Sequence, residues 1–532
     1  MSRVVKRVYT QVWTDTNYMS TSIRVIKNTG WLYAKMGITM FISLWTTRLI
    51  LSGLGASDFG IFNVVGGVIS MLGFLNAAMA SATQRFMSFA QGAGEKEKQK
   101  VIFNVSVVLH LCIALVIAIC LVIAGLYFFN GILTIPNERI NAAIVVYISL
   151  IVSTLFTIMN VPYDAIMNAH ENMKYFAVIG VFESILKLIV AFICIYSTTD
   201  KLILYGIMMG CIPIITLTIM KFYCHWKYEE CYLSPIKLWD KTLSKEIISF
   251  AGWNFLFSGA SMISSYGQGV ILNSFFGPLL NAAQGITGQL NGQLQSLSSN
   301  FMKALNPVFA KSVGASNTNL LFKATWSGAK FSTALFLIVA IPFFCYTESV
   351  LTLWLGNVPD WTCFFLKLQL IRTFIEFMFS PTCSVVLANG NIKWFCIFSA
   401  LFNALQLPVI YILFNMGFPP YVMYLVAILF GNVLTYVVAF LVNKRICKFS
   451  FVDYLNNVII PIIFSILPAA CSYYMILLLP TYKGSFIINM ITIAGIYLIS
   501  FYMFACKRHE KELIISLCKK IKKHDISCNS TL

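Results

Sequence analysis

Charged residues are scarce in this chain: Asp, Glu, Lys and Arg make up 11% of its 532 residues, whereas 58% are hydrophobic. The mean hydropathy is +0.79. A water-soluble chain of this length does not fold and stay dispersed with so little charge. The scarcity excludes a soluble enzyme and predicts a polytopic membrane protein.

Patterns that hold metals or phosphates are also absent from the sequence. The 5 histidines are scattered, and the 15 cysteines form no CxxC pair and mostly lie within hydrophobic runs. Such cysteines are typical of small hydrophobic residues, not of disulfides or metal ligands. No glycine-rich nucleotide motif follows a strand pattern. We therefore expect no metal site and no cofactor.

Hydrophobic runs of about 20 residues, long enough to cross a bilayer, recur along the chain, and we count about fourteen. They begin near Thr29, Phe59, Asn104, Ile140, Tyr175, Leu202, Ile247, Leu280, Thr325, Trp361, Trp394, Tyr421, Val458 and Ser485. These runs predict an all-α polytopic membrane protein of about 14 transmembrane helices.

Positive charge lies mainly on one side of these spans. Roughly thirty of the 38 Lys and Arg residues fall in the amino-terminal segment, in every second loop and in the tail, and only about three (Arg139, Lys201 and Lys483) fall in the opposite loops. The first residues lack the apolar core of a secretory signal. We expect both termini to be cytoplasmic, and attribute the net charge of +18 to topology and anionic lipids rather than to nucleic acid.

The chain contains an internal repeat. An offset of 222 positions aligns Gly30 with Gly252, Gly55 with Gly277, Gly66 with Gly288 and Gly92 with Gly314, and an offset of 219 aligns "PYDAIMNAHENMKYF" with "PTCSVVLANGNIKWF". A repeat of this length holds six spans, so equivalent helices run in the same direction, as in transporters whose substrate path lies between two parallel repeats.

The repeat divides the chain into six predicted segments. They are a cytoplasmic amino-terminal segment (1–28), an N-lobe of six helices (29–224), a cytoplasmic linker (225–246), a C-lobe of six helices (247–443), two further helices (444–505) and a basic cytoplasmic tail (506–532).

The predicted eighth span, "LLNAAQGITGQLNGQLQSLSSNF", is too polar to face lipid. One helical face carries Gln284, Thr287, Asn291, Gln295 and Ser298, and Gln289, Gln293 and Asn300 widen it. An unsatisfied amide in hydrocarbon costs several kcal/mol. We predict that Gln284, Asn291 and Gln295 line a hydrated cavity suited to sugar hydroxyls; the alternative is that amide hydrogen bonds attach the helix to its neighbours.

Ionisable residues also lie within predicted spans. Glu183 and Lys187 are four residues apart in the fifth span, and Arg372 and Glu376 repeat this spacing in the tenth. Each pair can neutralise itself along one helix face. Alternatively, one member of each pair contacts substrate or takes part in ion coupling, which is the usual role of ionisable residues at this depth.

The first span carries two further cations. Arg48 shares a helix side with small residues such as Gly37, which indicates contact with protein. We predict that Arg48 faces a cavity, with snorkelling to the outer surface as the alternative. Lys35 lies near the cytoplasmic end, where snorkelling is the more frequent outcome, and is a further candidate for the cavity.

Two stretches of the chain resemble the Wzx-type polysaccharide flippases of the multidrug/oligosaccharidyl-lipid/polysaccharide (MOP) superfamily: "NTGWLYAKMGITMFISLWTTRLILSGLGASDFGIFNVVGGVISMLGFLNAAMASATQRFMSFAQGAGEKEKQKVIF" and "NVPYDAIMNAHENMKYFAVIGVFESILKL". The resemblance implies two MATE-like lobes around a cationic cavity in the bacterial inner membrane. It also implies translocation of an undecaprenyl-diphosphate-linked oligosaccharide by alternating access, for O-antigen, capsule or exopolysaccharide synthesis. Arg48 and Lys187 would contact the diphosphate, and a polymerase and glycosyltransferases would be partners.

Two alternative functions remain open. A cation-coupled drug or metabolite exporter of the same superfamily needs an acidic coupling site in the N-lobe, where Glu183 has a lysine one turn away and Asp58 lies at a helix end. A membrane glycosyltransferase or polymerase needs a large outer loop with catalytic groups, and the longest predicted outer loop is "NGILTIPNERIN". We therefore predict a flippase rather than an enzyme, with its coupling ion unspecified.

Overall fold

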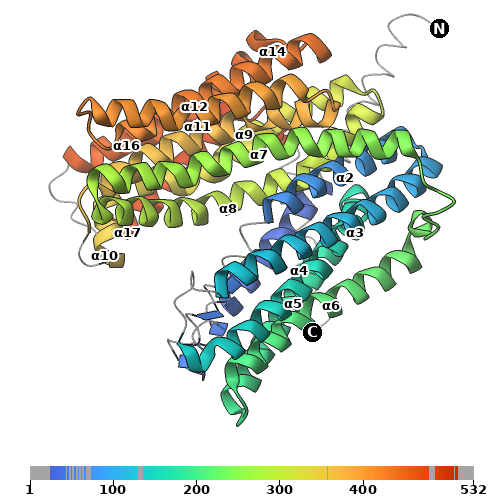
Figure 1. Cartoon of the computed structure of the whole chain (residues 1–532). Coiled ribbons are helices and arrows are strands. Elements are labelled where there is room, and N and C mark those ends of the chain that lie inside the picture. Colours follow the sequence, from blue (N-terminus) through green and yellow to red (C-terminus); the bar gives the residue numbers. More distant parts are fainter. Residues whose placement is uncertain are drawn as a thin grey trace, which may run out of the picture. The chain divides into compact units, whose positions relative to one another are not determined.

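The computed structural model describes residues 24–43, 73–129, 136–355, 358–478, 486–508 and 510–512, together with 45–46, 49–50, 53–55, 58, 61–62 and 65–66. These residues are almost entirely helical and include no strand, which confirms the predicted all-α class (Figure 1). Eleven of the described helices are long and apolar enough to cross a membrane. That number is consistent with a count of about 14, because much of the first two predicted spans lies outside the described residues.

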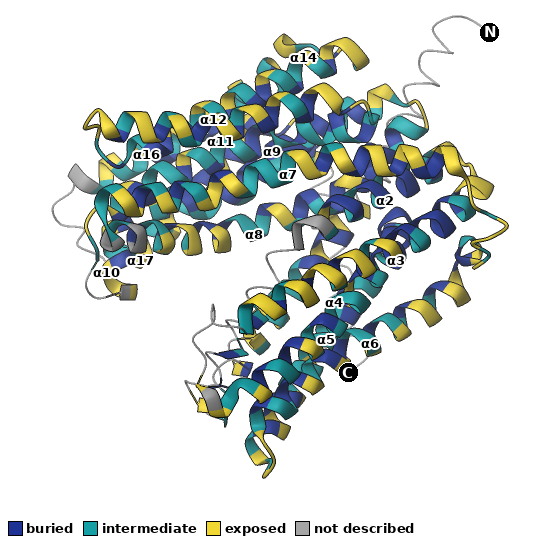
Figure 2. Ribbon diagram, viewed as in Figure 1, coloured by how far each residue is buried: buried dark blue, intermediate teal, exposed yellow. Residues whose placement is uncertain are grey.

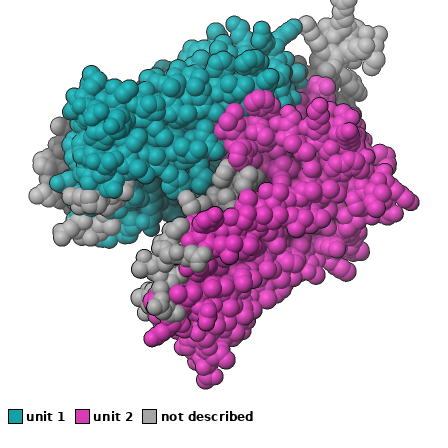
Figure 3. Space-filling view, viewed as in Figure 1, with its two compact units in different colours: residues 1–26, 259–309, 318–532 teal, residues 27–258, 310–317 magenta. Residues whose placement is uncertain are grey.

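Unit 2 comprises residues 27–258 and 310–317 (Figure 3). Its helices are an unlabelled helix over 24–43, α2 (Gly73–Ala93), α3 (Lys96–Tyr127), α4 (Ile140–Ala169), α5 (Met173–Tyr196), α6 (Lys201–Lys227) and the first half of α7 (Lys241–Phe276). Short capped turns join them: Asn172 accepts a hydrogen bond from the backbone of Tyr175, and Asp200 caps α6 in the same way. α4 lies centrally, against α2, α3 and α6.

Unit 1 comprises residues 1–26, 259–309 and 318–532. After the second half of α7 follow α8 (Pro278–Gly314), α9 (Thr318–Cys345), α10 (Thr347–Leu355), α11 (Thr362–Asn389) and α12 (Lys393–Asn415). Each of the last three spans contains a π-helical stretch: α13 (Val422–Val426), η4 (Ala427–Leu434) and α14 (Thr435–Cys447); α15 (Phe451–Tyr454), η5 (Leu455–Ile459) and α16 (Ile460–Leu478); α17 (Phe486–Ser500) and η6 (Phe501–Ala505).

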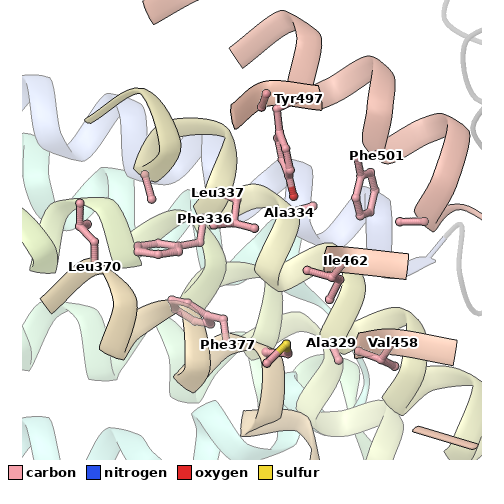
Figure 4. Close-up of a cluster of buried hydrophobic side chains, with 14 of the residues drawn as sticks. Ala329, Ala334, Phe336, Leu337, Leu370, Phe377, Val458, Ile462, Tyr497 and Phe501 are labelled. Carbon is pink, nitrogen blue, oxygen red and sulfur yellow. The ribbon is translucent and has the colours of Figure 1, made fainter. Parts of the chain in front are cut away.

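A hydrophobic core joins the last two spans to the rest of unit 1 (Figure 4). Phe336 of α9 and Phe377 of α11 lie with ring centroids 5.6 Å apart. Ile462 of α16 and Tyr497 of α17 belong to the same cluster. Lipid tails are as apolar as these side chains, so close packing, rather than escape from water, stabilises such a core in a bilayer.

The backbone reproduces the predicted repeat at its turns. Positive φ angles, which side chains rarely tolerate, occur at equivalent positions of the two halves. At the offset of 222 these are Gly55 (+79°) and Gly277 (+80°), and Gly94 (+75°) and Ser316 (+53°); at the offset of 219 they are Glu171 (+55°) and Gly390 (+86°). The two halves therefore share turn geometry even where the residue types differ.

Two glycines of unit 2 are packed against backbone at repeat-related positions. A Cβ on Gly92 would lie 2.3 Å from the carbonyl oxygen of Lys311, and a Cβ on Gly314 would lie 2.2 Å from that of Phe89. The offset of 222 that relates Gly92 to Gly314 also relates Phe89 to Lys311. The ends of α2 and α8 thus cross at a symmetric glycine contact, and Lys311 Nζ also donates to Glu171 Oε1 at 2.6 Å.

Candidate functional site

Four charged side chains of unit 2 form what we call the charged cluster: Lys35 on the helix over 24–43, Asp164 on α4, and Glu183 and Lys187 on α5. Lys187 Nζ donates to Glu183 Oε1 at 2.6 Å. Lys35 interacts electrostatically with the other three. The structure thus brings together three of the residues singled out in the sequence.

Lys35 is held against α5 by a specific local arrangement. Its Nζ lies 4.2 Å from the centroid of the Phe176 ring, a cation–π contact. A Cβ on Gly180 would lie 2.1 Å from Lys35 Cε, so the lysine side chain runs directly over this glycine of α5 and would have to shift if a larger residue stood there. Gly180 and Phe176 therefore position the ammonium group beside the acidic groups.

The charged cluster is paired but still accessible. The side chains of Lys187 and Glu183 are 40% and 39% exposed. An ion pair between residues four apart on a helix contributes only about 0.2–0.5 kcal/mol. Both side chains therefore keep accessible surface while they are paired.

Asp164 is the member of the cluster that the sequence analysis did not single out. It lies in the stretch "PYDAIMNA", beyond the roughly 20 residues of the predicted fourth span, and the structure extends α4 over it to Ala169. Asp58, the other acid considered for the N-lobe, accepts a hydrogen bond at 2.9 Å from Nε of Arg139, in the short helix η2 (Asn137–Arg139). Asp164 and Glu183 are therefore the better candidates for an acidic role.

Arg372 and Glu376 of α11 make no ion pair, although the structure describes both residues. Arg372 Nε instead donates to Asn432 Oδ1 at 3.3 Å, and Asn432 Nδ2 donates to the Arg372 carbonyl oxygen at 3.2 Å. The guanidinium is thus held by a neutral amide from η4. Among the described residues, no carboxylate hydrogen-bonds to it.

The amides of α8 have two different environments. Thr373 of α11 donates to Asn291 at 2.9 Å and accepts from Gln295 at 3.3 Å. These bonds fit the alternative in which amides attach the helix to its neighbours, and a cavity-lining role for Asn291 and Gln295 stays a prediction. Gln284 is half-buried, and its lining role is likewise untested.

The exposed side of α8 carries Gln289 and Gln293 beside Gly285, Gly288 and Gly292 (Figure 2). A Cβ on any of these three glycines would meet nothing within 4 Å. α8 is not among the eleven helices apolar enough to cross a membrane by composition. Because exposed amides are costly in hydrocarbon, this side of α8 is suited to water or a polar ligand.

Unit 1 also holds a buried ion pair that the sequence analysis missed. Lys330 of α9 donates to Glu510, and the two side chains are 2% and 4% exposed. Glu510 also accepts from Ser327 Oγ at 2.6 Å and from the backbone N–H of Lys507 at 2.8 Å. Burial raises the pKa of Glu510, but the charge of Lys330 and these hydrogen bonds outweigh it and lower the pKa below its ordinary value of 4.5.

Arg48, the first cation singled out in the sequence, lies outside the described residues. Within the described part of the chain, no group of three or more His, Cys, Asp or Glu side chains could hold a metal ion. The candidate groups for binding by charge and hydrogen bonds are two lysines and two carboxylates in unit 2, and a guanidinium with amides in unit 1.

Comparisons with known proteins place the charged cluster within a recognised domain. Residues 34–193 match the MatE family model, and this range contains all four cluster residues. Over 100 residues the chain is 26% identical to the uncharacterised membrane protein EpsK of Bacillus subtilis (strain 168), a stretch that is 19% of this chain and 20% of that protein. The chain thus matches about one fifth of the length of this curated relative.

About four fifths of the chain has the fold of solved MATE transporters. A crystal structure of MATE in complex with MaD3S has a TM-score of 0.67, 17% identity, and coverage of 80% of this chain and 96% of that chain. A MOP superfamily transporter from Pyrococcus furiosus has a TM-score of 0.65 at 17% identity, with the same coverages of 80% and 96%. An outward-facing multidrug resistance MATE family transporter of the MOP superfamily has a TM-score of 0.63 at 16% identity, again covering 80% and 96%.

Proposed function

We propose that this protein is a MOP superfamily transporter that flips an undecaprenyl-diphosphate-linked oligosaccharide across the bacterial inner membrane by alternating access. The MatE match and the MATE fold support the transporter class. The observation that carries the choice of substrate is the charged cluster, in which the half-buried Lys35 and the partly exposed Lys187 lie near two carboxylates.

A diphosphate suits these lysines chemically. Two ammonium groups can each donate charge-assisted hydrogen bonds to its oxygens, and such bonds contribute about 1.5–3 kcal/mol each. Asp164 and Glu183 balance Lys35 and Lys187 when no substrate is bound, which lowers the cost of keeping cations at this depth. Arg372, held by Asn432, supplies a further cation in unit 1.

The glycan part of the substrate needs a different surface. Gln289 and Gln293 present amide donors and acceptors on a side of α8 where glycines leave space for a bulky group. Amides exchange hydrogen bonds with sugar hydroxyls as readily as with water. In this proposal α8 accompanies the hydrated sugars while the lipid tail stays in the bilayer.

The cation-coupled exporter is the second candidate, because Asp164 and Glu183 are two acids in one lobe within reach of Lys35. In that function the acids bind the coupling cation and the lysines are counter-charges. One relative by fold, the P. furiosus transporter, is described as having a binding pocket of reverse polarity. The fold therefore accommodates pockets of different charge, so the choice between the two functions depends on the charged residues of this chain.

Replacement of the cluster lysines separates the two functions. In a strain that depends on this gene for surface polysaccharide, Lys35→Gln and Lys187→Gln should each lower surface glycan about 10- to 100-fold, as expected from losing one charge-assisted hydrogen bond. Immunoblotting of membrane fractions checks that protein levels are unchanged. Lys98→Gln is the matched control, because Lys98 is exposed and pairs only with Glu95 at 3.0 Å.

The exporter function predicts the opposite pattern. Asp164→Asn would then abolish drug resistance conferred by overexpression, while the lysine variants would leave surface glycan intact. Normal glycan in both lysine variants at normal protein levels would refute the flippase proposal.

A further inference from the structure

Unit 2 contains a second polar site, well separated in sequence from the charged cluster. It is a pocket of about 310 Å³ at the end of the unit where α2 passes into α3 and α6 ends. The lining includes Lys96, Gln99 and Lys100 of α3, His170 at the end of α4, and Lys227 and Glu229. The distribution of positive charge predicts that this end faces the cytoplasm.

The pocket meets the start of a long helix. α3 is 32 residues long, and its N-cap residue, Glu95, makes no side-chain capping hydrogen bond. The first turn therefore offers backbone N–H groups and the positive end of the helix dipole, a combination that binds phosphate groups. Lys96 and Lys100 lie on this turn and add positive charge.

A buried amide supplies an independent sign of a ligand. Gln99 is only 3% exposed and lines the pocket, yet its side chain makes no hydrogen bond to any residue that the structure describes. An acceptor bound in the pocket would take up the hydrogen bonds that this amide does not make to protein.

The acidic residues around the pocket are mostly engaged. Glu97 pairs with Lys100 at 2.8 Å, and Glu230 accepts a hydrogen bond from His170. Within the described chain Lys96 and Lys227 make no direct ion pair, although Lys96 interacts electrostatically with Glu230. Glu229 is the remaining carboxylate at the pocket. Both lysines can therefore donate hydrogen bonds to a bound anion.

Exposed aromatic and aliphatic residues surround this end of unit 2. Trp226 is 77% exposed and adjoins Lys227, while Tyr232 is 65% and Ile236 is 94% exposed. Such residues concentrate at the headgroup level of a membrane, where lysines bind anionic lipids. These exposed residues therefore predict that the pocket lies at the depth of lipid headgroups.

We infer that this pocket binds the phosphate of a phospholipid headgroup from the cytoplasmic leaflet. The phosphate lies at the N-terminus of α3 between Lys96 and Lys227, and Gln99 donates its amide hydrogen bonds to it. Trp226 and Tyr232 place the pocket where the acyl chains can remain in the bilayer. This site is independent of the proposed transport substrate.

Thermal unfolding of the full chain in lipid-free detergent micelles tests the site. Addition of phosphatidylglycerol or phosphatidylethanolamine should raise the unfolding midpoint of the wild type in a saturable manner. The double variant Lys96→Gln/Lys227→Gln and the single variant Gln99→Leu should each need at least about tenfold more lipid for the same shift, which corresponds to about 1.4 kcal/mol. Lys98→Gln, on the same helix but outside the pocket, should behave as the wild type.

Three outcomes would overturn the inference. The first is that the wild type and the lysine double variant respond equally to lipid. The second is that Lys98→Gln loses the response as much as the double variant does. The third is that inorganic phosphate raises the unfolding midpoint to the same plateau and is sensitive to the same variants, which would make the ligand a free anion. Lys96 and Lys227 are exposed, so the double variant is expected to fold even if Gln99→Leu does not.

Discussion

The two units hold their lysine–glutamate pairs in opposite ways. In unit 1 the side chains of Lys330 and Glu510 are 2% and 4% exposed, whereas in unit 2 those of Lys187 and Glu183 are 40% and 39% exposed. Glu510 accepts hydrogen bonds from three groups, and Glu183 from Lys187. A charge with every partner supplied by the protein stabilises the fold, while one that keeps accessible surface is available to a ligand.

The largest expected effect comes from breaking the buried ion pair of Lys330 and Glu510. Glu510→Ala leaves the ammonium of Lys330 buried without its counter-charge, which destabilises a protein by about 3–5 kcal/mol. We expect a lower unfolding midpoint in detergent and less protein in membranes. Circular dichroism during heating measures the first effect.

Two measurements check that the loss comes from the unpaired charge. The double variant Lys330→Met/Glu510→Leu should recover most of the stability, because apolar replacements of a buried ion pair are often neutral. The depressed pKa of Glu510 means that its stabilisation is complete above its ordinary value of 4.5 and is lost as pH falls through the lower folded value. If Glu510→Ala were as stable as the wild type, Lys330 would not depend on Glu510 as its counter-charge.

An intermediate effect is expected for the neutral network in unit 1. Thr373→Val keeps the shape of the side chain but removes the hydroxyl that bonds Asn291 and Gln295. The unsatisfied amides should lower the free energy of unfolding by about 1–3 kcal/mol. Denaturation of the purified protein measures this change.

Thr492→Val is the control for the threonine substitution, because Thr492 is exposed on α17 and bonds only the Ile488 carbonyl oxygen of its own helix. It should leave stability unchanged within about 0.5 kcal/mol. Equal losses in the two variants would mean that α8 is not attached through Thr373.

The smallest change in stability is expected in unit 2. Exchange of the pair, Glu183→Lys/Lys187→Glu, should alter the free energy of unfolding by less than about 1 kcal/mol, because the pair is half-exposed and its members are four residues apart. Surface glycan should nevertheless fall, since the position of the cation matters for a bound diphosphate. A destabilisation as large as that of Glu510→Ala would contradict the distinction between a buried, stabilising pair in unit 1 and an accessible pair in unit 2.

Local spacing explains what the sequence could predict. Helical periodicity and run length gave the all-α class, and the four-residue spacing of Glu183 and Lys187 anticipated their ion pair. Partners distant in the chain could not be foreseen, because sequence spacing carries no information on tertiary distance. Lys330 meets Glu510, 180 residues later, and Arg372 takes Asn432 rather than the nearer Glu376.

The eighth span shows the same limit on a single helix. Its amides predict a helix that is too polar for lipid, but their number did not reveal which would find partners within the protein. Thr373, on α11, bonds Asn291 and Gln295, whereas Gln289 and Gln293 are exposed. Only the positions of neighbouring helices distinguish an amide that holds the fold from one that meets a ligand.

The glycine crossing of Gly92 and Gly314 has a mechanical consequence. Where helices interlock through large side chains, a change of crossing angle requires rotamers to rearrange. At this crossing carbonyl groups of one helix end lie directly against a glycine of the other, with no side chain between the two backbones. A side chain introduced at Gly92 or Gly314 would therefore force the end of α2 and the end of α8 apart.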